Sequence, residues 1–316
     1  MKNRITTFLA VVFCCSAILS AAQPAIREKY TWSAETDLAN YTVKEINLST
    51  GVRLEYAEQG SDQGIPVIFL HGVTDSWHSF ENVLPLLPSN FHAFAISQRG
   101  HGNSSRPKAG YSLVDFSNDI AEFIRQKNTG PVIIVGHSMG SLVAQQFAYD
   151  HPQLLKAIVL VGADACFIDN PGMLEFVEEI EKLNDPIDRK FMDDFQKATL
   201  ATPINRDYFE ILVNESMKLP AAVVKSVFRG IMEVDFTNKL KTFQAPVLIL
   251  WGDKDAFCFE QDQAVLQSNI KSAKLKVYNG TGHALHWEQP EKFVDDLEEF
   301  VDTIQSELQR KNLLEN

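Results

Sequence analysis

The stretch that decides the fold runs from Val132 to Ala148 and reads VIIVGHSMGSLVAQQFA. Its first four residues are β-branched and apolar, which predicts a short buried strand. After Gly136 the apolar spacing becomes that of a helix, and Ser138 stands at the junction with a glycine two positions away on each side. Glycine permits a sharp turn and close strand–helix contact. The pattern predicts either a reactive serine beside the free N–H groups of a helix start or a tight turn that merely contains serine.

Seven further runs along the chain predict strands, and amphipathic helices alternate with them. The first two runs flank a Ser-Thr-Gly turn and predict a hairpin, whereas the others are near-continuous apolar segments typical of parallel strands covered on both faces. The seven ranges are 43–48, 52–58, 67–70, 93–96, 157–161, 247–251 and 275–278. Strands that alternate with helices predict a doubly wound α/β fold with a mostly parallel, eight-stranded sheet.

One long stretch interrupts this alternation. Residues 169–236 contain helical patterns and no convincing strand. A single crossover between parallel strands needs only about a dozen residues, so the excess predicts a helical cap inserted after the sixth strand. We therefore assign 23–168 and 237–316 to the core domain and 169–236 to the cap.

The N-terminus has the composition of a targeting segment. A basic start is followed by an apolar run over 5–22 that ends in small residues. This pattern predicts a secretory signal peptide over 1–22, and the run is short for a membrane anchor, which is the alternative. We expect a secreted or periplasmic protein without stable membrane association after cleavage.

Charge and cysteine content narrow the functional classes. The formal net charge of −12 disfavours nucleic acid as a partner, so a small-molecule substrate is expected. After signal cleavage two cysteines remain, Cys166 and Cys258. Two cysteines do not form a disulfide framework, but a single bridge between them stays open. The sequence does not indicate the oligomeric state.

A serine hydroxyl is a weak nucleophile that needs a base and an orienting carboxylate. Asp255 follows the predicted strand 247–251, and His283 follows the strand 275–278. Both positions lie just past the carboxyl end of a strand, where α/β sheets assemble their sites. Three other residues compete for these roles, namely Asp253, Asp164 and His286.

Four motifs in this order resemble those of the α/β-hydrolase superfamily, in the branch with a helical cap after the sixth strand. The motifs are His71-Gly72, Gly136-His137-Ser138-Met139-Gly140, Gly252-Asp253-Lys254-Asp255 and Gly282-His283. The resemblance implies that Ser138 is the nucleophile, His283 the general base and Asp255 the orienting acid. It also implies an oxyanion hole made by the backbone N–H groups of Val73 and Met139. Epoxide hydrolases and haloalkane dehalogenases of this branch use an aspartate in place of the serine.

The expected activity is hydrolysis of a small, largely uncharged carboxylic ester or lactone, without a cofactor. Trp77, Phe167 and Trp287 are candidates for substrate contact, with plain core packing as the alternative. The pair His283 and His286 has no further ligand cluster around it in the sequence, so no metal is expected. Carbon–carbon bond hydrolysis and acyl transfer on the same triad stay open, as does a ligand-binding receptor on a hydrolase fold.

Overall fold

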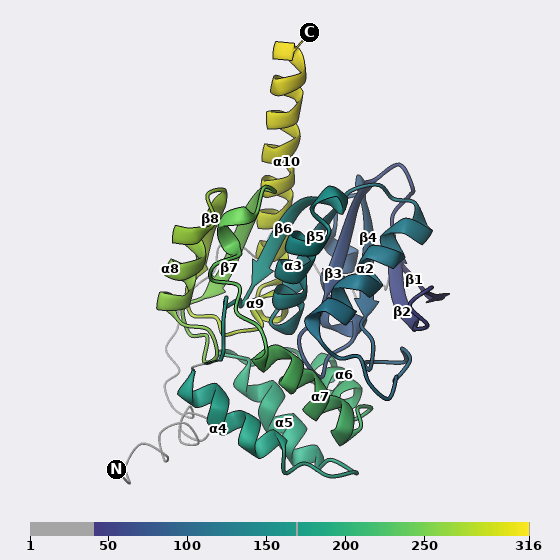
Figure 1. Ribbon diagram of the computed structural model, residues 1–316, viewed down its shortest axis with the longest axis vertical. Coiled ribbons are helices and arrows are strands. Elements are labelled where there is room, and N and C mark those ends of the chain that lie inside the picture. The colour runs from purple at the N-terminus through teal and green to yellow at the C-terminus, as the bar shows by residue number, and fades with distance from the viewer. Residues whose placement is uncertain (1–40, 169, 316) are drawn as a thin grey trace. The chain divides into compact units, whose positions relative to one another are not determined.

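The computed structural model describes residues 41–168 and 170–315 (Figure 1). The predicted signal peptide over 1–22 lies outside these residues. Within the described part of the chain, no helix combines the length and the apolar character needed to cross a membrane.

Eight strands form one sheet in the order β1-β2-β4-β3-β5-β6-β7-β8. The pairings of β1 with β2 and of β2 with β4 are antiparallel, and every other pairing is parallel. This arrangement confirms the predicted eight-stranded, mostly parallel sheet. The strands are β1 Tyr41–Asn47, β2 Arg53–Gln59, β3 Ile65–Leu70, β4 Phe91–Ser97, β5 Val132–His137, β6 Leu155–Val161, β7 Val247–Gly252 and β8 Ala273–Tyr278.

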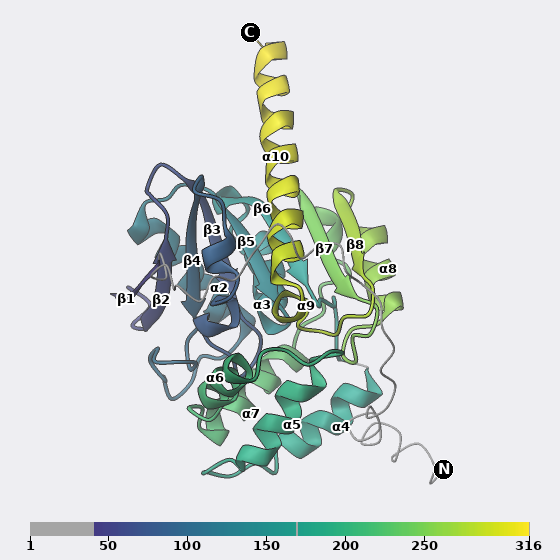
Figure 2. The same cartoon turned by 180° about the vertical axis from the view of Figure 1, so that it is seen from behind.

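Helices cover both faces of the sheet, which explains why the central strands β3 to β7 are largely apolar without alternation. Successive strand residues point to opposite faces, so Ile134 belongs to one apolar cluster and its neighbour Val135 to the other. The first face packs against α2, α3 and α8, and the second against α10 (Figures 1 and 2). Outside the insertion the helices are α2 Leu113–Lys127, α3 Met139–Asp150, α8 Glu260–Asn269, α9 Leu285–Glu288 and α10 Pro290–Glu315, with 3-10 turns η1 Trp77–Phe80, η2 Leu84–Leu86, η3 Pro152–Leu154 and η4 Leu240–Thr242.

Four helices lie between β6 and β7, within the range 169–236. They are α4 Pro171–Ile180, α5 Arg189–Ala198, α6 Arg206–Ser216 and α7 Ala221–Met232, and we call them the inserted helices. Side chains of Asn170, Asp188 and Asn205 accept hydrogen bonds from the first turns of α4, α5 and α6. These caps satisfy N–H groups that a helix start leaves unpaired, which explains where the three helices begin. A single bridge between Cys166 and Asp235 joins the two ends of the insertion.

The sequence left open whether Cys166 and Cys258 form a disulfide, and in the structure they are not joined by one. Cys258 is buried, and its thiol donates to the carbonyl oxygen of Gly162 at 3.4 Å. Burial raises the pKa of this thiol well above its usual range, so it stays protonated at neutral pH.

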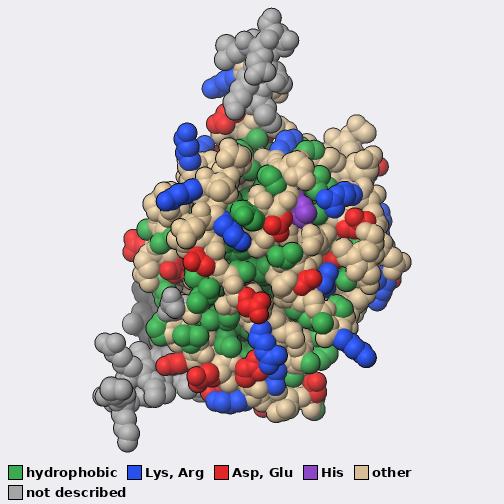
Figure 3. Space-filling model, in the orientation of Figure 1, with side chains coloured by type: hydrophobic (Ala, Val, Ile, Leu, Met, Phe, Trp, Pro, Cys, Tyr) green, Lys and Arg blue, Asp and Glu red, His purple; other side chains and the backbone are tan. Residues whose placement is uncertain are grey.

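On the face seen in Figure 3, acidic and basic side chains are interspersed over the surface. The described side chains of that face form no continuous basic patch.

Candidate active site

Ser138 occupies a strained turn between a strand and a helix. Strand β5 ends at His137 and α3 begins at Met139, which leaves Ser138 between them with φ 53° and ψ −120°. A positive φ costs a non-glycine residue about 1–3 kcal/mol and persists only where surrounding bonds enforce it. Here the backbone N–H of Ser138 donates to the Val161 oxygen at 3.0 Å, and the Ser138 carbonyl accepts from the N–H and hydroxyl of Ser141 at 2.8 and 2.6 Å.

The two glycines that flank this serine are required by close backbone contacts. A Cβ at Gly140 would lie 2.2 Å from the carbonyl oxygen of Leu70, and a Cβ at Gly136 would lie 2.2 Å from the oxygen of Gly140. Both distances are far inside van der Waals contact. The glycines therefore let α3 start directly against the end of β3.

The predicted base and acid are brought together in the loops after β8 and β7. Nδ1 of His283 lies 2.8 Å from Oδ2 of Asp255, and both residues are buried. The other oxygen, Oδ1, accepts the backbone N–H groups of Phe257 and Cys258 at 2.8 and 3.0 Å. These two bonds orient the carboxylate. A carboxylate acceptor assigns the ring proton to Nδ1, which leaves Nε2 of His283 as the basic atom.

The competing residues have other partners. Asp253 accepts the backbone N–H of Gly280 at 2.6 Å and so stabilises the turn after β8. Asp164 accepts the N–H of Ala165 at 2.6 Å, and burial raises its pKa to about 6. His286 is fully buried, and its Nε2 lies 3.1 Å from the hydroxyl of Ser79. Of the three candidate acids, Asp255, Asp253 and Asp164, it is Asp255 whose side chain forms a hydrogen bond with His283.

A cavity lies between the carboxyl edge of the sheet and the inserted helices. Ser138 and His283 line it together with Val73, Met139 and Phe167 from the predicted site. Most of the remaining lining is apolar or aromatic: Leu142, Met173, Phe176, Phe195, Phe228, Ile231 and Phe257. The polar side chains of the lining, apart from the candidate triad, come from Asp75, His137, Gln196 and Thr199.

Trp77 and Trp287 are not among the residues that line this cavity. The ring of Trp77 packs edge-on against Tyr41, with the centroids 5.2 Å apart. Trp287 is buried and donates its indole N–H to the carbonyl oxygen of Ser79 at 2.9 Å. For these two residues the structure favours the alternative of core packing, whereas Phe167 does face the cavity.

The positions of Val73 and Met139 suit an oxyanion hole. Met139 is the first residue of α3, so its N–H has no acceptor within the helix. Among the described residues, no hydrogen bond is made by either backbone N–H. Both residues line the cavity beside Ser138, which makes their backbone N–H groups the candidate donors to an oxygen bound there.

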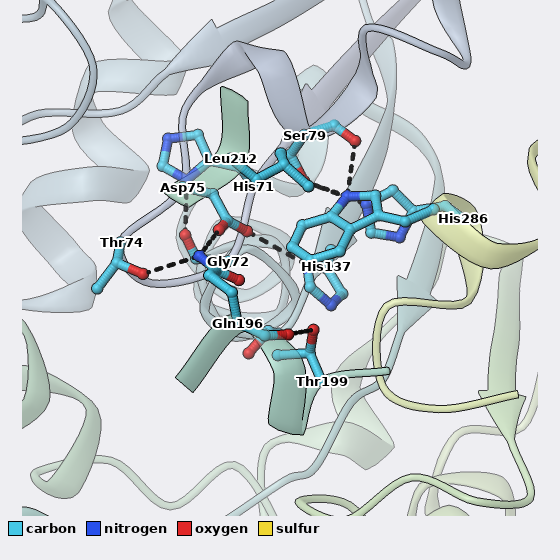
Figure 4. Close-up of polar contacts among 12 residues, drawn as sticks. His71, Gly72, Thr74, Asp75, Ser79, His137, Gln196, Thr199, Leu212 and His286 are labelled. Atoms are coloured by element: carbon cyan, nitrogen blue, oxygen red, sulfur yellow. Dashed lines mark hydrogen bonds and ion pairs between the residues drawn. The ribbon is translucent and has the colours of Figure 1, made fainter. Parts of the chain in front are cut away.

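Sequence reasoning missed two buried polar residues of the cavity, Asp75 and Gln196. Their side chains are 2% and 1% exposed, and Gln196 Nε2 donates to Asp75 Oδ1 at 2.8 Å (Figure 4). Burial raises the pKa of Asp75 to about 7. The hydrogen bonds to this carboxyl favour its charged form and lower the pKa, but their effect is smaller than that of burial. Burial likewise holds the pKa of the neighbouring His137 well below its usual range. A glutamine among apolar positions of a predicted helix was the one signal available for Gln196.

Two groups of side chains among the described residues lie close enough to share a metal ion. The first is Asp255, Cys258 and His283, but its carboxylate and imidazole already bond to each other. The second is Glu58, Asp62 and His92. There Lys44 and Lys127 donate to Glu58 at 2.9–3.1 Å, so cationic side chains already occupy the carboxylate.

Comparison with known proteins supports the fold. The model of the alpha/beta hydrolase fold family matches residues 65–208. A Mycobacterium tuberculosis protein that is named as uncharacterised is 27% identical over 272 residues, which are 80% of this chain and 79% of that protein. Epoxide hydrolase 1 of Caenorhabditis elegans is 25% identical over 80% of this chain and 69% of its own. An esterase structure from Exiguobacterium antarcticum superposes with a TM-score of 0.73 at 22% identity, covering 84% of this chain and all (100%) of that one.

The chain has the α/β-hydrolase fold, and the family model and the named relatives support a hydrolase.

Proposed function

We propose that this protein hydrolyses small, largely uncharged carboxylic esters or lactones through Ser138, His283 and Asp255. The observation that carries the proposal is the buried pair of His283 and Asp255, 2.8 Å apart, at a cavity that Ser138 also lines. A strained serine at a helix start and an oriented imidazole that lines the same cavity are the groups that acyl transfer requires.

In this mechanism the Ser138 hydroxyl attacks the ester carbonyl while Nε2 of His283 accepts its proton. The negative charge that develops on the carbonyl oxygen is stabilised by the N–H groups of Val73 and Met139. His283 then protonates the departing alkoxide, which leaves an acyl group on Ser138. A water molecule, deprotonated by the same imidazole, hydrolyses that ester and restores the free serine.

The cavity lining supports an apolar substrate. Phe176 and Phe195 stack with their centroids 5.6 Å apart, and Phe228 meets Phe176 edge-on at 5.5 Å. These rings come from α4, α5 and α7, so the inserted helices would act as the cap that selects the acyl or alcohol group. A charged substrate would lose its hydration in this lining without gaining an ionic partner there, apart from the site groups themselves.

The names of the relatives cover several chemistries. The nematode relative is named an epoxide hydrolase and the Exiguobacterium structure an esterase. The serine at position 138 supports the ester reaction, because epoxide hydrolases of this superfamily use an aspartate at the equivalent turn.

We also propose that the protein is secreted or periplasmic. N-terminal sequencing of protein recovered outside the cytoplasm should show that the first 22 residues have been removed.

A panel of p-nitrophenyl esters with two to ten acyl carbons, a γ-lactone and a 1,3-diketone tests the proposal. We expect turnover of the shorter esters, and a loss of several orders of magnitude, up to about a millionfold, in Ser138→Ala. If the diketone is cleaved in preference to the esters, the proposed reaction would be carbon–carbon bond hydrolysis and not ester hydrolysis. Product formed only when an acceptor alcohol is added would indicate acyl transfer. Binding of an ester without turnover would favour a receptor.

A further inference from the structure

The loop between β3 and η1, residues 71–76, carries one of the two proposed oxyanion donors in a strained backbone. Thr74 has a φ of 68°, a value that is an outlier for a β-branched residue. Strain of this kind costs about 1–3 kcal/mol and persists only where neighbouring contacts over-determine the conformation. Val73 directly precedes this residue, so the direction of its N–H depends on whatever holds Thr74 in place.

The Asp75 N–H closes this turn by donating to the Gly72 carbonyl oxygen at 3.3 Å, and a further contact comes from the inserted helices. Gln196 of α5 extends its side-chain amide into the loop, and Nε2 lies 2.8 Å from Oδ1 of Asp75 and 3.2 Å from Oγ1 of Thr74 (Figure 4). The same nitrogen lies 2.8 Å from the hydroxyl of Ser216 on α6. One amide therefore links α5, α6 and the loop, although residues 75 and 196 are 121 positions apart in sequence.

Burial makes this link costly to lose. Thr74, Asp75, Gln196 and Ser216 are all at most 2% exposed, so water cannot replace a missing hydrogen bond without entering the protein. An unsatisfied buried acceptor costs more than the hydrogen bond itself contributes. Without the amide, the strained turn would gain by relaxing toward a conformation that satisfies Asp75 elsewhere.

We propose that Gln196 is a positioning residue: it holds the turn at Thr74 and Asp75 so that the Val73 N–H stays aimed at the oxyanion beside the Met139 N–H. The inserted helices then complete the oxyanion hole as well as covering the cavity. This inference rests on the proposed function, since it assigns a role in stabilising the oxyanion of that reaction.

The test uses Gln196→Met, which keeps the length of the side chain and removes the amide. The matched control is Gln146→Met, because Gln146 is also buried, at 3% exposure, and its side-chain amide donates to Asp150 on the same helix, α3. A second variant, Gln196→Asn, keeps an amide but is one methylene too short to reach the loop. Each protein is assayed for kcat and KM on p-nitrophenyl acetate and for affinity toward a trifluoromethyl ketone. Amide hydrogen exchange is followed in the peptide that spans residues 71–76.

Removing one oxyanion donor from a hydrolase typically lowers kcat about 10²–10³-fold. Displacing the donor in the Gln196 variants should have a smaller effect than removing it. We expect kcat and the affinity for the ketone each to fall about 10–100-fold, with KM changed less than about threefold. Exchange in residues 71–76 should accelerate in both Gln196 variants and stay unchanged in Gln146→Met.

Two results would overturn the inference: unchanged exchange in residues 71–76, or an equal loss of kcat in Gln146→Met. A rise in KM at constant kcat would assign Gln196 to substrate binding and would also overturn it. Failure of the proposed function is a separate outcome, because wild type would then turn over no ester at all. The exchange measurement would still report in that case whether Gln196 holds the loop.

Discussion

The carboxyl of Asp75 should make the protein less stable as the pH rises toward neutrality, and Asp75→Asn should remove that loss. Burial raises the pKa of this group from 3.8 to about 7. Between these two values the unfolded chain has released the proton and the folded protein still holds it. The free energy of unfolding therefore falls with increasing pH across this window and levels off above it.

The size of the effect follows from the two pKa values. Each pH unit between them is worth about 1.4 kcal/mol, so Asp75 should cost roughly 4 kcal/mol at pH 8 relative to pH 3. Asparagine has the shape of the protonated acid and can still accept the hydrogen bond from Gln196. The ionisable groups nearest to Asp75 include His137 and His283, and both remain in the variant.

Urea unfolding of wild type and Asp75→Asn from pH 4 to pH 8, at constant ionic strength, measures the difference directly. The variant should gain stability over wild type as the pH rises, by several kcal/mol at pH 8. Asp207→Asn serves as the control, because it removes an exposed carboxylate from α6. Parallel curves for wild type and Asp75→Asn would refute the reasoning, since they would mean that this carboxyl titrates alike in both states.

Three substitutions test other parts of the account. Gly140→Ala should destabilise the fold by more than about 2 kcal/mol, because its Cβ would lie 2.2 Å from the Leu70 oxygen; an unchanged urea midpoint would contradict this. Asp255→Asn should lower kcat on the order of 10⁴-fold in the ester assay. A decrease of less than about tenfold would mean that Asp255 is not the acid of the triad. Phe195→Ala should move the preferred acyl chain to greater length by enlarging the cavity, whereas Phe209→Ala, outside the cavity lining, should leave the chain-length profile unchanged.

The parts of the structure that local sequence patterns encode were predictable. Apolar runs located the central strands β3 to β7, because a strand buried on both faces has few polar positions, and the Ser-Thr-Gly turn located the hairpin of β1 and β2. Their ends were less certain: β6 begins at Leu155, two residues before the predicted start, where its pairing with β5 contains a shift in register beside Val132. Ser138 was visible for a similar reason, since a strained turn in close contact with its neighbours needs glycines at fixed positions.

The residues that face the cavity from the inserted helices were not predictable. Helical periodicity identifies an apolar face but does not say which surface that face will contact. Phe176 and Phe195 therefore could not be told from core residues. For Trp77, which packs on Tyr41, the sequence left substrate contact and core packing both open. The contact between Asp75 and Gln196 depends on how α5 docks, which no local pattern records.

Covalent labelling tests the central claim most directly. Wild type, Ser138→Ala and Ser117→Ala are treated with a fluorophosphonate probe, and the labelled peptide is located by mass spectrometry. Ser117 is a fully buried serine of α2, so its variant controls for the loss of a serine elsewhere in the core. The account predicts one label, on Ser138, in wild type and Ser117→Ala, and none in Ser138→Ala. Labelling that persists in Ser138→Ala, or a folded wild type that never labels, would contradict it.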